Sequence, residues 1–450
     1  MNKFKDFTVK EPVFKNAEYN IKDFGAVADG KTDVSQSINN AINTCSEKGG
    51  GKVVVPQGIW FSGPIELKSN VNLHLESGSV ILFSDNYKDY PLIYTSFEGF
   101  FMYRCVSPLY GKDLENVAVT GKGVIDGNGD AWRPVKDWKL TERAWKKLTA
   151  KGGYVEQSGD TKIWWPFEIN AQADAHFKKE PSAYKDKEIC QKYHPYLRPA
   201  LFNLTKCKNV LIEGVTIQNS PAWALHPWLC EDITIRNISI RNPWYSQNGD
   251  GLDLDSCKNA LIVGSSFDVG DDAICMKSGK NEDGRELGVP TENVKISDCT
   301  VFHGHGGFVV GSEMSGGIKN VYVKNCLFIG TDVGLRFKSC LGRGGVVEDI
   351  FIEDINMTNI PGEAIIFTMG YDMDTKEGQE VSLEEVPEFK NIYISDVVCT
   401  SAGKPITISG LPQIPVHHVY MSNIDIVSEG DIKESYAENI VKENINIVRK

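Results

Sequence analysis

The sequence predicts an all-β protein folded as a parallel β-helix, and three observations carry this prediction. One short pattern recurs eight times in the second half of the 450-residue chain, its apolar residues alternate with polar ones, and segments of variable length separate its copies. Repeats with a period of about 20–50 residues are typical of solenoids, propellers and arrays. A period of two favours strands over helical pairs. No repeated Trp-Asp signature of a propeller blade occurs.

Each copy of the pattern begins with an amide, acidic or imidazole residue, which we call the anchor. The anchors are spaced by 23, 27, 34, 27, 29, 42 and 27 residues and are Asn209, Asp232, Asn259, Asn293, Asn320, Asp349, Asn391 and His418. We expect two short strands joined by a tight bend in each copy. Successive copies would then stack as coils and bury a continuous apolar column that no single coil could form.

The earlier part of the chain supplies the expected first coils and a cap. Apolar segments at 53–55, 71–75 and 117–119 resemble the strands of the repeats, and a helical pattern from about Asp33 to Cys45 precedes them. A solenoid needs a cap, because its terminal coil otherwise exposes unpaired strand edges. We expect the helix to cap one end and the polar tail after about Ser428 to cap the other. Residues 1–450 would form a single β-helix domain.

A charged and aromatic-rich stretch at about 129–197 interrupts the repeats. It carries five tryptophans, Trp132, Trp138, Trp145, Trp164 and Trp165. We interpret it as a long excursion over one face of the solenoid, and call it the excursion below. Two interpretations stay open: a satellite apolar cluster packed on the flank, or a wall of a binding cleft, since long loops are usually functional.

Charge and composition exclude several functions. A formal net charge of −12 and a pI near 5.3 argue against a nucleic-acid surface, which needs a basic stripe. An acidic substrate would have to be held by local cations in a cleft, because salt screens the wider field beyond a Debye length of about 8 Å. The 11 cysteines include no Cys-x-x-Cys pair, which argues against a structural zinc site. We expect the cysteines to be small buried hydrophobic residues of the core. We expect no cofactor.

The N-terminal segment and the hydropathy of the chain bear on where in the cell the protein is located. The segment from Met1 to Phe14 lacks the apolar run of a secretory signal peptide. We expect a cytoplasmic protein, or a periplasmic or secreted one if the sequence has been trimmed. No stretch is long and apolar enough to span a membrane. The sequence does not predict an oligomeric state.

Three carboxylates form the first candidate site: Asp250, Asp271 and Asp272. Their anchors, Asp232 and Asn259, place them on neighbouring coils, which stack at about 4.8 Å. Crowded carboxyls raise the pKa of at least one of them, so that an acid and a base coexist near neutral pH, as hydrolysis of a glycosidic bond requires. Taken alone, Asp-Asp after Gly270 is more often a polar turn or a set of calcium ligands.

Two further motifs share the order and coil phase of these aspartates. His305 lies 12 residues after Asn293, as Asp271 lies 12 after Asn259, and it could orient the acid. Arg336 and Lys338 lie two apart and would project from the same face of a strand, where they could grip a sugar carboxylate. A structural histidine in a glycine bend and a solvated basic edge are the alternatives.

These residues, in this order, closely resemble the polygalacturonase family of glycoside hydrolases (family 28), which carry Asn-Thr-Asp, Gly-Asp-Asp, Gly-His-Gly and Arg-Ile-Lys motifs. The corresponding segments here are 248–250, 270–272, 304–306 and 336–338. The resemblance covers nearly the whole chain, with further similarity at 23–33, 123–127, 219–221, 226–227 and 277–279. It implies a right-handed, pectate-lyase-like β-helix. Gly249 and Phe337 depart mildly from the family pattern.

The resemblance also implies roles. Asp271 corresponds to the general acid, Asp250 and Asp272 to the pair that positions and deprotonates water, and His305 to a residue that supports the acid. Arg336 and Lys338 match residues that bind the galacturonate carboxylate at the leaving-group side. Tyr371 matches a family tyrosine that contacts the sugar. No metal is expected at this site.

The expected activity is therefore inverting hydrolysis of α-1,4-galacturonosyl linkages in pectin-derived galacturonans. The run from Gly311 to Gly317 resembles bacterial exo-acting members, and the excursion could close one end of a cleft, so we expect attack from the non-reducing end. The alternatives are an endo-polygalacturonase, a hydrolase of rhamnogalacturonan or substituted galacturonan, a calcium-dependent pectate lyase, and a β-helical protein that binds polysaccharide without cutting it.

Overall fold

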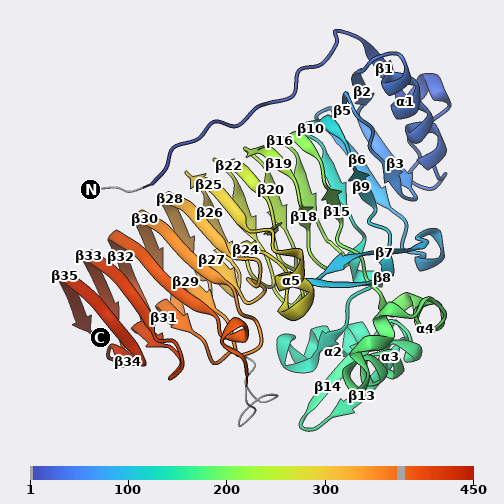
Figure 1. Ribbon diagram of the computed structural model, residues 1–450. Helices are drawn as coiled ribbons and strands as arrows, with labels where there is room; N and C mark the ends of the chain where they lie inside the picture. Colours follow the sequence, from blue (N-terminus) through green and yellow to red (C-terminus); the bar gives the residue numbers. More distant parts are fainter. Residues whose placement is uncertain (1–3, 372–380) are drawn as a thin grey trace.

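The computed structural model describes residues 4–371 and 381–450, and the chain winds into a parallel β-helix (Figure 1). Its 30-stranded sheet system consists of three columns of parallel strands, in which each strand pairs with its equivalent in the next coil. The structural relatives reported below are right-handed β-helix proteins, and the predicted fold class is confirmed.

The first column contains the strands that begin with the anchors. Its members, in stacking order, are β1 (Glu18–Asn20), β2 (Gly51–Val55), β5 (Val71–Leu75), β10 (Glu115–Gly121), β16 (Lys208–Glu213), β19 (Glu231–Arg236), β22 (Lys258–Val263), β25 (Thr291–Ser297), β28 (Ile318–Ile329), β30 (Val346–Thr358), β32 (Glu388–Ser409), β33 (Val416–Ser428) and β35 (Ala437–Arg449).

The second column is shorter, because the strands of the later coils run on through the bend. It comprises β3 (Gly58–Ser62), β6 (Ser79–Phe83), β11 (Val124–Asp126), β17 (Thr216–Gln218), β20 (Ser239–Arg241), β23 (Ser266–Asp268) and β26 (Thr300–His303).

The third column carries the site. It comprises β4 (Ile65–Glu66), β9 (Leu109–Lys112), β15 (Phe202–Thr205), β18 (Leu225–Trp228), β21 (Leu252–Asp255), β24 (Ile274–Lys277), β27 (Gly306–Gly311), β29 (Val333–Lys338), β31 (Ile360–Thr368) and β34 (Lys433–Ser435).

The anchors owe their composition to backbone geometry. All eight have positive φ, between 52° and 57°, a left-handed conformation that Asn and Asp tolerate better than most residues. Several also donate along the stack: Asn293 Nδ2 donates to Asn259 Oδ1 at 2.9 Å, and Asn320 Nδ2 to Asn293 Oδ1 at 2.8 Å. The amide residues therefore both turn the chain and link one coil to the next.

Apolar side chains from all three columns fill the interior, and the predicted helix closes its first end. Helix α1 (Ser35–Glu47) covers the first coils with Ile38, Ala41, Ile42 and Cys45, all fully buried. The polar tail does not form a separate cap, contrary to our expectation, because β34 and β35 continue the stack as its last coil. The 11 cysteines are all buried, as predicted.

Two insertions stand beside the third column (Figure 1). One is the antiparallel hairpin of β7 (Leu92–Phe97) and β8 (Phe100–Cys105). The other is the excursion, with helices α2 (Glu142–Thr149), α3 (Glu168–Lys179) and α4 (Lys187–Lys192) and a small sheet of β12 (Val135–Lys136), β13 (Tyr154–Ser158) and β14 (Thr161–Trp165). A further helix, α5 (Asn281–Leu287), follows β24.

Short 3-10 helices complete the described elements. They are η1 (Ile21–Phe24), η2 (Tyr87–Asp89), η3 (Gly129–Ala131), η4 (Asp137–Lys139), η5 (Pro181–Lys185), η6 (His194–Tyr196) and η8 (Leu383–Glu385). None of the helices in the described part of the chain has the length and apolar character needed to cross a membrane.

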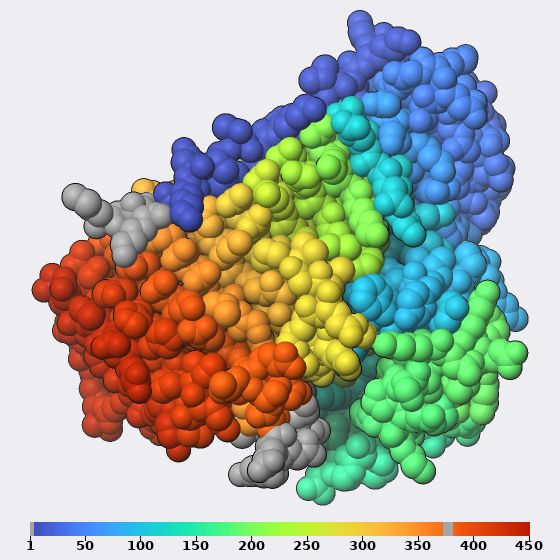
Figure 2. Space-filling view, viewed as in Figure 1, coloured from blue at the N-terminus to red at the C-terminus, as the bar shows by residue number. Residues whose placement is uncertain are grey.

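The excursion forms the satellite apolar cluster of the first interpretation, and it also lines a surface hollow. Trp132 and Phe177 belong to a second apolar cluster, separate from the solenoid core, and Trp164 and Trp165 are buried as well. Trp138, by contrast, is 64% exposed and lines a surface hollow. The space-filling view shows the excursion, in green, projecting beside the coils (Figure 2).

Candidate active site

The third column brings the three predicted carboxylates together. Asp250 lies in the bend before β21, and Asp271 and Asp272 lie in the bend before β24, the next strand of the column. One carboxylate oxygen from each of the three lies within 4.8 Å of the others. Residues 22 positions apart in sequence thus converge because the coils stack in register.

Gly249 and Gly270 allow this convergence because the chain packs too closely there for a side chain, and not because their φ is positive. An added Cβ at Gly270 would lie 2.3 Å from Ser246 Oγ, and one at Gly249 would lie 1.9 Å from the same atom. The left-handed residue in this bend is Asn248, with φ of 54°. The departure of Gly249 from the family pattern therefore has a local cause in the side chain of Ser246.

Asp250 is a carboxyl whose surroundings favour the protonated form. Its side chain is buried, and Oδ1 has no hydrogen-bond partner among the described residues. Burial, followed by the negative charges of Asp253 and Asp271, raises the pKa of Asp250 well above the usual aspartate range. A buried oxygen without a partner leaves a place for a water or a substrate hydroxyl.

Asp271 has the opposite electrostatics, because His305 faces it from the next coil. His305 Nδ1 lies 3.3 Å from Asp271 Oδ1, and Nε2 lies 3.6 Å from Asp332 Oδ2. Burial opposes ionisation of Asp271, but the hydrogen bond and charge of His305 hold its pKa below the usual range. The same hydrogen bond raises the pKa of His305. In the free protein the proton of this pair therefore resides on the imidazole.

Asp272 is held by the two basic residues predicted to grip substrate. Lys338 Nζ donates to Asp272 Oδ2 at 2.6 Å, and Arg336 Nη1 donates to Oδ1 at 3.3 Å. Burial works against the charge on Lys338, but Asp272 outweighs it and raises the Lys338 pKa. The Tyr371 ring lies 4.9 Å from Lys338 Nζ and 5.7 Å from Arg336 Cζ. All seven predicted site residues thus lie in one region.

A buried polar network behind the carboxylates was not predicted. Lys277 Nζ lies 2.7 Å from Glu313 Oε2 and 3.6 Å from Asp253 Oδ1, and all three side chains are nearly or fully buried. Burial first, and then nearby carboxylates including Asp272, raise the pKa of Asp253, although Lys277 opposes this. The network therefore places fixed charges, those of Asp253 and Lys277, next to Asp250. Lys277 and Glu313 do fall within runs that resemble the family, which was the available signal.

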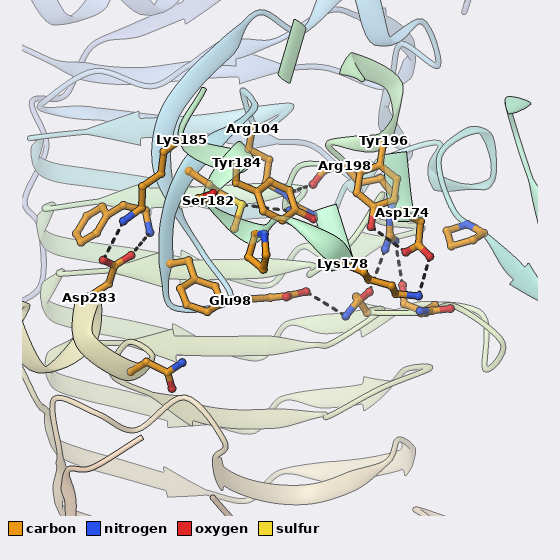
Figure 3. A pocket seen from close by; sticks show the side chains of 18 of the residues that line it. Glu98, Arg104, Asp174, Lys178, Ser182, Tyr184, Lys185, Tyr196, Arg198 and Asp283 are labelled. Carbon is orange, nitrogen blue, oxygen red and sulfur yellow. Dashed lines mark hydrogen bonds and ion pairs between the residues drawn. The ribbon is translucent and has the colours of Figure 1, made fainter. Parts of the chain in front are cut away.

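A cavity lies beside the bend that carries Asp250, although none of the three carboxylates lines it (Figure 3). It measures about 770 Å³, is lined by the β7–β8 hairpin, the excursion and α5, and reaches Gln247 and Asn248 in the bend that carries Asp250. Arg198 links the two regions, because its Nη2 donates to Asn248 Oδ1 at 2.9 Å. This volume falls within the range of about 300–1,000 Å³ typical of small-molecule sites.

The donor set also permits a cation. Asp250, Asp271 and Asp272 could each offer one oxygen to a metal ion. Asp272, however, is already neutralised by Lys338 and Arg336, so an added cation would compete with two fixed positive charges. The arrangement favours acid–base chemistry, with one carboxyl able to keep a proton and another held as the anion.

A parallel β-helix with clustered carboxylates, a paired histidine and basic groups beside them defines a glycoside hydrolase that acts on polysaccharide. The comparisons specify the class further. Residues 168–445 match the sequence profile of the glycosyl hydrolases family 28, and the chain belongs to that family. Residues 19–97 match a second profile, described as rhamnogalacturonase A/epimerase, pectate lyase-like.

Several relatives are similar over most of their length. The crystal structure of a hyperthermoactive exopolygalacturonase from Thermotoga maritima is 34% identical, with a TM-score of 0.83, over 98% of this chain and 94% of that one. An exo-poly-alpha-D-galacturonosidase of Dickeya chrysanthemi is 29% identical over 95% of this chain and 71% of its own. A polygalacturonase from Erwinia carotovora, 24% identical with a TM-score of 0.67 over 98% and 99% of the two chains, shares the fold.

Proposed function

We propose that this protein hydrolyses α-1,4-galacturonosyl linkages of galacturonan and releases short products from the non-reducing end. The observation that carries the proposal is the convergence of Asp250, Asp271 and Asp272 beside Arg336 and Lys338 in a chain of family 28. The carboxylates supply acid and base, and the two cations are suited to a carboxylate-bearing sugar.

The proposed roles are those that the family resemblance implies, and the contacts support them. Asp271 is the proton donor to the glycosidic oxygen, and His305 is its reservoir: substrate binding excludes water, raises the cost of the Asp271 charge, and moves the proton from Nδ1 to Oδ1. Asp272, which Lys338 and Arg336 hold as the anion, deprotonates the attacking water. Asp250, whose raised pKa favours the protonated form, helps to position that water, because its Oδ1 has no partner among the described residues and leaves room. Arg336, Lys338 and Tyr371 bind the sugar on the leaving-group side.

Inversion of the anomeric centre is general to the family, although the carboxylate oxygens here lie closer than in most inverting enzymes. Such enzymes usually separate the two carboxyl groups by about 6.5–9.5 Å to make room for water. The short spacing implies that the water lies beside Asp250 and Asp272 rather than on a line between acid and base. Proton NMR of the first product should show the inverted anomer, and the retained anomer would contradict this geometry.

The position of the β7–β8 hairpin and the excursion supports terminal attack. The β7–β8 hairpin and the excursion stand over the early-coil side, next to the bend of Asp250, and two of the relatives above are named as exo-acting enzymes. A groove closed at one end admits a chain terminus better than the middle of a polymer. Digestion of long polygalacturonate should release reducing ends with little early loss of viscosity, whereas a rapid viscosity drop at low bond cleavage would indicate an endo-acting groove.

A pectate lyase is the nearest rival, because the three carboxylates could also bind calcium. Lyase products carry a double bond and absorb in the ultraviolet. We expect full activity in the presence of a chelator and no rise in absorbance, since a hydrolase activates water with carboxylates alone. Chelator-sensitive activity with rising absorbance would replace hydrolysis by β-elimination.

A further inference from the structure

Within the described part of the chain, one largely buried lysine near the site, Lys139, has no ion-pair or hydrogen-bond partner. Six lysines and arginines are buried in the described part of the chain: Arg104, Arg133, Lys139, Lys277, Lys338 and Arg343. Five of them have a hydrogen-bond or ion-pair partner among the described residues. For Lys139 no hydrogen bond and no carboxylate within 4.0 Å is found in residues 4–371 and 381–450. Its side chain lies against Trp138, with Nζ 5.6 Å from the ring centroid.

Lys139 is only 8% exposed, but its Nζ is not among the enclosed polar atoms without a hydrogen bond, so the ammonium itself is reached by solvent. Burial lowers the pKa of Lys139, the charge of Asp271 and then that of Asp332 partly compensate, and the like charge of Lys136 lowers it further. Buried charges are normally paired, because their lost hydration is otherwise uncompensated. Folding thus leaves the positive charge of Lys139 without a counter-ion near the proposed proton donor, Asp271. An anion of the substrate could pair with it.

The position of Lys139 joins the excursion to the catalytic bend. Lys139 ends η4, and the neighbouring Lys136 and Trp138 line a hollow of about 230 Å³ together with Gln247, three residues before Asp250. The exposed ring of Trp138 offers an apolar face beside the charge. An aromatic face next to a cation suits a sugar acid, which has one apolar ring face and one carboxylate.

Two other excursion cations, Lys178 and Lys185, are already engaged (Figure 3), whereas Lys136 lines the hollow and has no ion pair among the described residues. Lys178 Nζ lies 2.7 Å from Asp174 Oδ2, and Lys185 Nζ lies 3.2 Å from Asp283 Oδ1. A substrate carboxylate would have to displace these partners, whereas at Lys139 it would displace only water. Lys139 also lies outside both matched profiles, which cover residues 19–97 and 168–445.

We propose that Lys139 binds the carboxylate of the galacturonate unit that lies over Asp271, as a second carboxylate grip in addition to Arg336 and Lys338. This inference rests on the proposed function and extends it: the excursion recognises substrate charge as well as closing the cleft. The ammonium donates to the carboxylate in a charge-assisted hydrogen bond, and no covalent step is involved.

The test compares steady-state kinetics of wild type and Lys139→Met on trigalacturonate and on its methyl ester. Loss of one charge-assisted hydrogen bond should raise KM for the charged substrate by about 10- to 100-fold with kcat changed little. KM for the neutral ester should stay near the wild-type value. Lys139→Arg should restore most of the affinity. Lys146→Met is the matched control, since Lys146 is an exposed excursion lysine paired with Glu142.

The outcomes separate the inference from the proposed function. Wild type that neither cleaves nor binds trigalacturonate in calorimetry would remove both. Wild type that cleaves it, with an unchanged KM in Lys139→Met, would remove only the role of Lys139. An unchanged KM with a shifted pH profile of kcat would make Lys139 a residue that tunes Asp271 and would equally overturn the proposal. Circular dichroism on each variant establishes that it is folded.

Discussion

His305 and Asp271 form a histidine–carboxylate pair across two coils, with Nδ1 3.3 Å from Oδ1, and the carboxylate side is the ionised one. The proton that glycosidic cleavage needs is therefore held on His305, the residue that pairs with the carboxyl that delivers it. This relationship depends on coil stacking, because the amide of His305 also donates to the carbonyl of Asp271 at 2.9 Å.

Replacing the donor should abolish most of the activity. Asp271→Asn keeps the size of the side chain but cannot pass a proton to the leaving oxygen, so kcat should fall by about 10²- to 10⁴-fold, the usual contribution of general acid catalysis. The thermal midpoint should stay close to that of wild type. A variant with near-normal turnover would remove Asp271 from this role.

The His305–Asp271 pair sets the alkaline limit of activity. The pKa of His305 is raised, so the pair keeps its proton until the pH climbs above the ordinary histidine value of about 6.5, and kcat/KM should decline only beyond it. In His305→Gln the proton must stay on a lone carboxyl, which loses it at lower pH. The descending limb of kcat/KM against pH should move to lower pH, and an unmoved limb would show that His305 does not hold the catalytic proton.

Lys338 has two functions that one substitution should expose. Lys338→Met leaves the buried Asp272 with less compensation, which should reduce the free energy of unfolding by about 3–5 kcal/mol. KM should rise more for trigalacturonate than for its methyl ester, because a carboxylate contact is lost.

A control for charge loss alone is Lys324→Met, which breaks an ion pair with Glu353 on the surface and should cost about 0–1 kcal/mol. Equal effects of Lys338→Met on charged and neutral substrates would refute the carboxylate grip. A change in stability no larger than that of the control would refute the structural pairing with Asp272.

The bend that carries Asp250 should tolerate no side chain at position 249 while Ser246 is present. Gly249→Ala puts a Cβ against Ser246 Oγ and should destabilise the fold by about 1–3 kcal/mol through overpacking. Ser246→Gly in the same chain should recover part of that loss. Urea unfolding of the two single variants and the double variant measures the coupling, and strictly additive losses would show that the two positions do not meet.

Much of the fold was predictable because each coil repeats a local constraint. The left-handed bend selects Asn or Asp at the anchors, and alternation marks the inward face, so Asn209 and its equivalents predict the register of the stack. That register places Asp250, Asp271, His305 and Arg336 on successive strands of one column. The helix over 33–45 was predictable from its own periodicity, and the structure has it at 35–47.

The electrostatics were predictable only in part. Crowding does raise the pKa of one carboxyl, but that carboxyl is Asp250, because it is buried next to Asp253 and has no cation in contact. Asp271 is held ionised by a histidine whose orientation no sequence pattern specifies. Lys139 gave no sequence signal, since it lies in the excursion, outside the repeat frame. Asp332 lies 12 residues after Asn320, in the phase of Asp271 and His305, and that spacing was the signal that could have found it.

The most direct test of the account is the time course of products from hexagalacturonate labelled at its reducing end. Terminal hydrolysis by the clustered carboxylates predicts that a labelled, shortened chain and an unlabelled short saturated product appear first and in equal amounts. Labelled products of intermediate length from the start, unsaturated products, or no cleavage by the folded protein would contradict it.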